Sequence, residues 1–159
     1  MSTTFFIGDM HLCHKNIIKY EPELRPFATI EEHDEELEAR WNRKVGSKDT
    51  VYVVGDVIFD PKGFFILQRL RGTKILVMGN HDIYPILDYA QHFKGIYGSA
   101  EFDGQLVTHI PADPCQAARY KGNIHAHLHA QTLATAFHRS VSAEQIGLAP
   151  IAYDELMGR

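Results

Sequence analysis

Three short apolar runs constrain the fold most strongly, and each ends in glycine followed by Asp or Asn. The runs are TTFFIGD (Thr3–Asp9), TVYVVGD (Thr50–Asp56) and KILVMGN (Lys74–Asn80). They are rich in β-branched and aromatic residues and almost continuously hydrophobic, which is typical of strands covered on both faces. Strands of this kind occur mainly in parallel sheets that are joined by helices. The sequence therefore predicts an α/β fold.

Helical patterns alternate with these runs. The segment Thr29–Val45 opens with a capping box, because Glu32 follows Thr29 by three residues. Its apolar residues then fall on one helical face: Ile30, Leu37, Trp41 and Val45. We predict a helix over this segment, with that face buried.

Two further segments also carry helix signals. In Asp60–Gly72, we expect Asp60 as the N-cap, Pro61 at the first helical position and Gly72 at the stop. The segment Asp82–Phe93 repeats the pattern, and its apolar residues are expected to face inward: Ile83, Ile86, Leu87, Ala90 and Phe93.

The second half of the chain has a different character. The segments Ala100–His109, Gly122–Ala130 and Arg139–Glu144 resemble shorter strands with little helix between them. We therefore expect strand–helix alternation first, then a more meander-like half, in one layered α/β protein. No repeat or linker interrupts the chain, so a single domain over residues 1–159 is predicted.

Composition and charge limit the expected cellular location and binding partners. Hydrophobic residues make up 45% and charged residues 23%, which is ordinary for a soluble globular protein. There is no apolar run near the ~20 residues of a membrane span, no signal peptide, and no disulfide framework from Cys13 and Cys115. These features favour a cytoplasmic protein without a membrane partner. The net charge of −4 provides no general basic surface for long nucleic acid.

Polar side chains follow several of the predicted strands. Because open α/β sheets collect ligands beyond the carboxyl ends of their strands, these side chains should share one rim. A single Gly-Asp pair is usually a turn, and a single histidine is usually structural. Five strand ends that all carry oxygen or imidazole donors are not expected by chance. The donors are Asp9, His11, Asp56, Asn80, His81, Asp82, His109, His125, His127 and His129.

In order and spacing, these motifs resemble the calcineurin-like metallophosphoesterases. The matching blocks are Asp9-Met10-His11, Gly55-Asp56, Gly79-Asn80-His81-Asp82, His109 and Ala126-His127-Leu128-His129. The sequences HKNIIKY, RPF and PIAYDEL are similar to a small single-domain bacterial and phage branch. The resemblance implies a layered α/β/β/α sandwich of mixed β-sheets flanked by helices, the calcineurin-like phosphoesterase fold.

The resemblance also implies a dinuclear metal site. It assigns Asp9, His11 and His129 to one metal and Asn80, His109 and His127 to the other, with Asp56 bridging them. Nitrogen and oxygen donors without thiolates suit two divalent ions, with Mn²⁺ as the first expectation and Fe, Zn²⁺, Co²⁺ or Ni²⁺ as alternatives.

Residues beside the ligands have separate expected roles. By resemblance, His81 is the catalytic residue that stabilises charge or protonates the leaving group, and Asn80 and His81 contact the substrate. Asp82 either orients His81 or caps the next helix, and the cap is preferred. Asn16 and Arg25 either reach the substrate or are ordinary surface or turn residues.

One position departs from the family pattern, which usually has glycine where this sequence has Ala126. The substitution requires a backbone conformation compatible with a Cβ atom. It also leaves open a slipped register in which His125 and His127 are the ligands. In the preferred register, His125 is a structural or supporting residue.

The expected function is hydrolysis of phosphodiesters, with phosphomonoesters as a second class, in a small or nucleotide-like substrate. A hydroxide that the metals generate from water would attack phosphorus. One alternative is a scaffold or binding protein on the same fold. Another is a nuclease that uses a local patch of Arg69, Arg71 and Lys74. The oligomeric state is undefined by the sequence.

Overall fold

The computed structural model describes residues 1–159 and contains a mixed five-stranded sheet in the order β4-β3-β2-β1-β9. Neighbouring strands from β1 to β4 pair in parallel, and β9 pairs antiparallel with β1. The three predicted apolar runs form its centre. The strands are β1 (Thr4–Ile7), β2 (Thr50–Val54), β3 (Thr73–Val77), β4 (Gly95–Tyr97) and β9 (Ile151–Ala152).

A second sheet has the order β5-β6-β7-β8. Its strands are β5 (Ala100–Phe102), β6 (Gln105–Val107), β7 (Gly122–His125) and β8 (His138–Ser140). The prediction of a meander is wrong for most of this sheet, because only β5 and β6 are antiparallel, whereas β6, β7 and β8 run in parallel. The connecting segments 108–121 and 126–137 are long enough to return the chain for parallel pairing.

The predicted helix near residue 30 is confirmed as α2 (Ile30–Lys44), in which Thr29 Oγ1 accepts a hydrogen bond from the Glu32 amide at 3.2 Å. Helix α3 (Gly63–Arg69) starts later than predicted, and Asp60 Oδ1 accepts the Lys62 amide at 2.9 Å in the turn that precedes the helix. The other short helices are α1 (Ile17–Tyr20), α4 (Ile86–Ala90), α5 (Tyr153–Met157) and the 3-10 turns η1 (Pro114–Ala118) and η2 (Ala143–Ile146). None of these helices has both the length and the apolar character needed to cross a membrane.

The prediction for Asp82–Phe93 is largely wrong. Helix α4 covers only Ile86–Ala90, and Ile83 and Leu87 are 80% and 75% exposed rather than inward-facing. Pro85 explains the short helix, since the residue before a proline is disfavoured in the helical region. Of the residues predicted to face inward only Phe93 is buried, and Tyr89, which was not predicted, is buried beside it.

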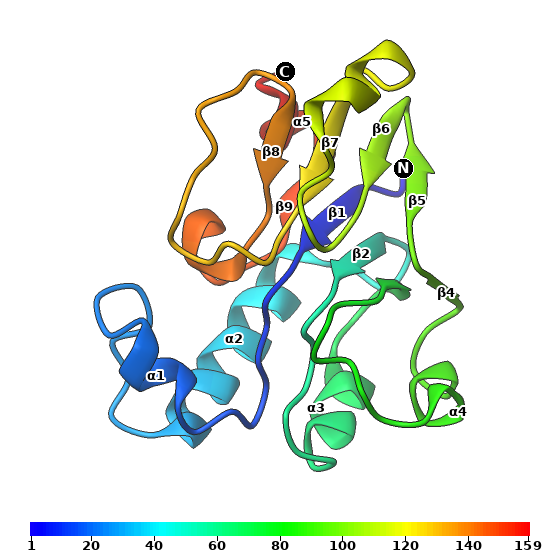
Figure 1. Ribbon diagram of the computed structural model, residues 1–159. Helices are drawn as coiled ribbons and strands as arrows, with labels where there is room; N and C mark the ends of the chain where they lie inside the picture. Colours follow the sequence, from blue (N-terminus) through cyan, green and yellow to red (C-terminus); the bar gives the residue numbers. More distant parts are fainter.

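Alternate residues of the central strands pack into two separate cores. On β1, Phe5 and Ile7 face the core beneath α2 and α3, whereas Phe6 faces the second sheet. Val54 and Val77 face the same way as Phe6 and meet Val107, Ile124, Ala126 and Val141. Figure 1 shows α2, α3 and α4 on one side of the first sheet and β6–β8 on the other. The molecule is therefore a layered mixed α/β fold with two packed sheets.

The two sheets also join directly at the end of β1. The Gly8 amide donates to the Val141 carbonyl at 2.7 Å, and the Ala143 amide donates to the Gly8 carbonyl at 3.0 Å. This connection brings the residues after β1 next to those that follow β7 and β8. It places donors from both halves of the chain at one rim.

Candidate metal centre

The candidate ligands meet at the carboxyl ends of β1, β2, β3, β6 and β7. Two groups form there, each containing three donors whose nearest atoms lie within 4.8 Å of one another. The first group contains Asp9, His11 and His129, and the second contains Asp56, His109 and His127. Both groups combine residues that are distant in the sequence, as the convergence of strand ends predicts.

Asp56 lies between the two groups. Its Oδ2 atom is 3.7 Å from His11 Nε2 and 3.4 Å from His109 Nε2. The other oxygen, Oδ1, accepts the His81 amide at 2.9 Å, which orients the carboxylate. A carboxylate in this position can contact an ion in either group.

Asn80 completes the second group with an amide oxygen. Asn80 Oδ1 is 2.9 Å from His109 Nε2, which in turn is 3.2 Å from His127 Nδ1. The other ring nitrogen of His109, Nδ1, donates its proton to the Val54 carbonyl at 2.9 Å, so Nε2 carries none in the neutral imidazole. Its Nε2 lone pair therefore faces other lone pairs, an arrangement that a cation would stabilise.

Several ligands have a left-handed backbone, which is uncommon for residues other than glycine. The φ angles are +51° at Asp9, +51° at His11, +54° at Asp56, +72° at His127 and +51° at His129. Backbone strain of this kind costs about 1–3 kcal/mol per residue and concentrates at functional sites. Elsewhere in the chain only Cys13, Asp103 and Leu148 share this conformation among residues other than glycine, so it is concentrated at the candidate ligands.

Two positions show why glycine accompanies the ligands. Gly55 has φ +78°, and a Cβ atom there would lie 2.4 Å from His109 Nδ1. At Gly8, a Cβ atom would lie 2.3 Å from the Cβ of Ala126. Ala126 is itself fully buried and has no positive φ, so its methyl group fills the space that Gly8 leaves. The departure from glycine at residue 126 is thus accommodated.

The structure supports the preferred histidine register. His127 and His129 lie in the two ligand groups, whereas His125 lies in neither. Instead, His125 Nδ1 donates to the Ala126 carbonyl at 2.9 Å, and its ring packs 5.5 Å from that of His138. His125 is thus buried outside both ligand groups.

Two buried atoms of the first group have no hydrogen-bond partner, namely Asp9 Oδ1 and His11 Nε2. Unpaired polar atoms are costly in a protein interior, and each such atom calls for an explanation. A bound cation would satisfy both. The donor set of carboxylates, imidazoles and one amide fits divalent ions such as Mn²⁺, Fe²⁺ or Zn²⁺.

The pKa values of the ligands reflect their burial and their charge partners. Burial raises the pKa of Asp9 to about 6 and lowers the pKa of His11 and His127. Burial also opposes the charged form of His129, but the hydrogen bond to Glu144 and the charges of Asp9 and Glu144 together outweigh this effect and raise the pKa of His129. Protons therefore compete with cations at this site near neutral pH.

A buried arginine supports the first group from behind. Arg25 is fully buried, so the expectation that it is a surface residue or reaches the substrate is wrong. Its guanidinium donates to the carbonyls of Asp9 and Met10, the latter at 3.0 Å, and to Glu144 Oε1 at 2.8 Å. Glu144 Oε1 also accepts His129 Nδ1 at 3.0 Å. This network holds the strained Asp9 backbone and orients His129.

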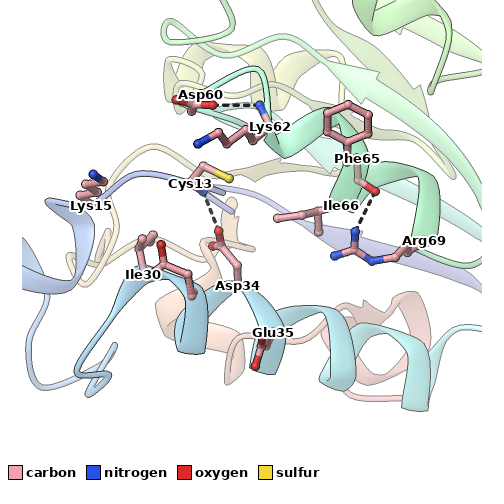
Figure 2. Close-up of a pocket in the computed structure, with 11 residues that line it drawn as sticks. Cys13, Lys15, Ile30, Asp34, Glu35, Asp60, Lys62, Phe65, Ile66 and Arg69 are labelled. Atoms are coloured by element: carbon pink, nitrogen blue, oxygen red, sulfur yellow. Dashed lines mark hydrogen bonds between the residues drawn. The ribbon is translucent and has the colours of Figure 1, made fainter.

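The same network continues to α2. Arg25 donates to His33 Nε2 at 2.7 Å, and His33 Nδ1 donates to Asp34 Oδ1 at 2.8 Å. Asp34 Oδ2 then accepts the Cys13 amide at 2.9 Å, as Figure 2 shows. The cavity drawn there, about 430 Å³ between α2 and α3, contains none of the candidate ligands. Asp34 thus supports the chain just after His11 from outside the centre.

Asp82 neither caps a helix nor orients His81, so both expectations are wrong. Its carboxylate accepts the backbone amides of Asp56 and Val57, each at 2.9 Å, and of Gly79 at 2.7 Å. Helix α4 starts too late for Asp82 to cap it, because Pro85 intervenes. Asp82 instead connects the two loops that carry Asp56 and Asn80.

His81 and Asn80 lie at the exposed mouth of the centre. The His81 ring is 6.3 Å from that of His11 and 5.0 Å from that of Phe59.

Asn16 is exposed at the start of α1, and its side chain does not cap that helix. Sequence reasoning missed Glu144, His33 and Asp34, because no local pattern connects them to the ligands.

Comparison with known proteins places the chain in a family. No family profile matches the sequence. An uncharacterized protein of Methanocaldococcus jannaschii is 34% identical over 139 residues, which cover 84% of this chain and 73% of that protein. The chain belongs to the same family as this archaeal protein.

Other relatives extend the comparison. The gene 66 protein of mycobacteriophage L5 is 39% identical over 105 residues, and the match covers 61% of this chain but only 48% of the phage protein. A crystal structure of a protein of unknown function from Aquifex aeolicus aligns with a TM-score of 0.82. It is 25% identical, and the alignment covers 99% of both chains. The mixed α/β fold thus recurs in a solved structure over nearly its whole length.

Proposed function

We propose that this protein is a dinuclear metal-dependent phosphoesterase with the calcineurin-like fold and an α/β/β/α arrangement of layers. One observation carries the proposal: Asp56, a donor of the second group, also approaches His11 of the first group, so its carboxylate lies where it can contact an ion in either group. Hydrolysis of phosphate esters commonly uses two ions about 3.5–4 Å apart, which clamp the attacking and leaving oxygens. The motif resemblance supports the same assignment.

The charges of the site favour an anionic substrate. Two divalent ions would contribute +4 against −2 from Asp9 and Asp56, which leaves a local surplus of positive charge. When bound, the ions would lower the pKa of water and neutralise charge on the phosphate. The protein holds their ligands in place through Arg25, Glu144 and Asp82.

His81 is the proposed proton donor to the leaving oxygen. Its exposure at the mouth leaves the imidazole open to substrate, and its amide is bonded to Asp56 Oδ1. Asn80 lies beside it and can donate its amide NH₂ to a phosphate oxygen while its Oδ1 faces the second group. These two residues position the substrate between the centre and solvent.

A small substrate is favoured over long nucleic acid. The cations suggested as a nuclease patch are engaged locally: Arg69 binds the Glu38 carboxylate, and Arg71 and Lys74 donate to backbone carbonyls. A scaffold with a degenerate site would be expected to lack some ligands, whereas all seven ligand positions lie together here. We therefore propose small phosphodiesters as the main class, with phosphomonoesters second.

A panel of phosphomonoesters, linear diesters and cyclic nucleotides, assayed with Mn²⁺, tests the proposal. We expect turnover of at least one diester and its loss in Asp56→Ala. In His81→Ala, turnover should fall by roughly 10²-fold or more, in line with general acid catalysis, while two Mn²⁺ ions remain bound. His92→Ala is the matched control, because His92 packs on Phe64 away from the centre. Full activity in Asp56→Ala would refute the two-metal mechanism.

A further inference from the structure

A cleft of about 350 Å³ lies next to the first ligand group. Besides His11 and His129, its walls are the residues of α1 and the loops after β1, β2 and β3: His14, Ile17, Tyr20, Glu21, Phe59 and His81. The cleft thus begins at the proposed catalytic histidine and extends to the exposed helix α1. A substrate whose phosphate lies at the centre would place a substituent here.

The cleft is built mainly from rings. Phe59 stacks on His14, with ring centroids 4.0 Å apart at 8°, and on His11, at 4.6 Å and 17°. Tyr20 approaches His14 edge-on at 6.1 Å, yet its side chain is 67% exposed. Tyr20 therefore presents a largely exposed ring against which a flat ligand can pack.

The charge of the cleft limits what it can hold. Apart from the imidazoles, Glu21 is the only carboxylic or basic side chain that lines the cleft, and no Lys or Arg is present. A second phosphate or a polyanion would be repelled by Glu21. A neutral planar ring with hydrogen-bond donors suits the combination of aromatic faces and one carboxylate acceptor.

A second cleft, of about 340 Å³, lies on the other side of the centre beside Asn80 and His109. Its remaining side chains carry no charge, and they include Met78, Thr108 and Ile110. Two clefts on opposite ligand groups provide separate places for the two substituents of a phosphodiester. A monoester would leave one of them empty.

We infer that the first cleft, which extends from the first ligand group to α1, is a binding site for the base of a nucleoside phosphodiester. The ring of the base is held against Tyr20 and Phe59. This inference rests on the proposed function only in placing the phosphate at the metal centre. Tyr20 is the residue that determines specificity, and Glu21 accepts hydrogen bonds from the base or sugar. The second cleft receives the other, uncharged substituent.

Calorimetric titration of the Mn²⁺-loaded protein tests the inference without turnover. The probes are the 5′-methylenephosphonates of adenosine and of ribose, which share a hydrolysis-resistant C–P bond and differ only in the base. Because stacking of a base on an aromatic side chain contributes about 1–3 kcal/mol, the adenosine compound should bind roughly 10-fold tighter or more. Tyr20→Ala should reduce this preference below about 3-fold, and Tyr20→Phe should retain it.

Phe65→Ala is the matched control, because Phe65 is an aromatic residue 64% exposed in the separate cavity between α2 and α3. The Phe65→Ala variant should prefer the adenosine compound over the ribose compound as strongly as the wild type does. Equal binding of the two probes, no binding of either, or an unchanged preference in Tyr20→Ala would overturn the inference. Hydrolysis of bis(4-nitrophenyl) phosphate is measured separately. Hydrolysis without a base preference refutes only the subsite, and a base preference without hydrolysis refutes only the proposed function.

Discussion

Replacing Asp82 tests whether the ligand loops depend on a buried carboxylate. Asp82 is 5% exposed and accepts three backbone amides, two at Oδ2 and one at Oδ1. In Asp82→Asn, the side-chain oxygen can still accept from the backbone amides of Asp56 and Gly79. The side-chain NH₂ then faces the backbone amide of Val57, and two donors meet. An unsatisfied buried donor costs about 1–3 kcal/mol, and the two remaining hydrogen bonds lose their charge assistance.

These losses have one offset. Burial raises the pKa of Asp82 against the effect of the three amides, so removing the charge recovers part of the desolvation cost. We therefore expect Asp82→Asn to lower the free energy of unfolding by about 2–3 kcal/mol, and Asp82→Ala by more than about 4 kcal/mol, because all three amides lose their acceptor. Such losses are a large fraction of a typical total of ~5–15 kcal/mol.

Urea denaturation in EDTA at pH 7.5, followed by far-ultraviolet circular dichroism, measures these changes. Asp60→Asn is the control, since Asp60 is only partly buried and accepts one local amide, that of Lys62 at 2.9 Å. It should change the free energy of unfolding by less than about 0.5 kcal/mol, as expected away from such buried features. A similarly small change in Asp82→Asn would refute the reasoning.

Three further results are expected. Arg25→Met should lower the free energy of unfolding by about 3–5 kcal/mol in urea denaturation, because it leaves Glu144 buried without its cation; a change below about 1 kcal/mol would contradict this. Glu144→Ala should weaken Mn²⁺ binding about 10–100-fold in calorimetry, because no side-chain oxygen then accepts from His129 Nδ1 to orient its ring, and unchanged affinity would exclude that role. Burial raises the pKa of Asp9 to about 6, and carboxylate partners, acting against burial, raise the pKa of His109 and His129. Because a metal binds the deprotonated form of each ligand, Mn²⁺ affinity should fall steadily as the pH is lowered from about 8 to about 5, and an affinity independent of pH over this range would contradict the ligand assignment.

The parts of the fold that were predictable depend on local patterns. The continuous apolar runs predicted β1, β2 and β3, because each of these strands is covered on both faces. The capping box and one apolar face predicted α2. The convergence of the ligands followed from the strand ends alone, since parallel strands deliver the residues after them to one rim.

The supporting contacts could not be predicted, because they join distant segments. Arg25 and Glu144 are separated by 119 residues, and neither carries a local signal for a buried ion pair. The three amides on Asp82 follow from the turn after β3, which a residue pattern does not specify. The parallel pairing of β6, β7 and β8 was missed because crossing segments without helices resemble the links of a meander.

The central claim is that two cations bind on either side of Asp56. Anomalous diffraction from crystals soaked in Mn²⁺ tests it most directly. We predict two peaks about 3.5–4 Å apart, one contacting Asp9, His11 and His129, the other Asn80, His109 and His127, with Asp56 between them. A single peak, or peaks that do not contact Asp56, would contradict the account.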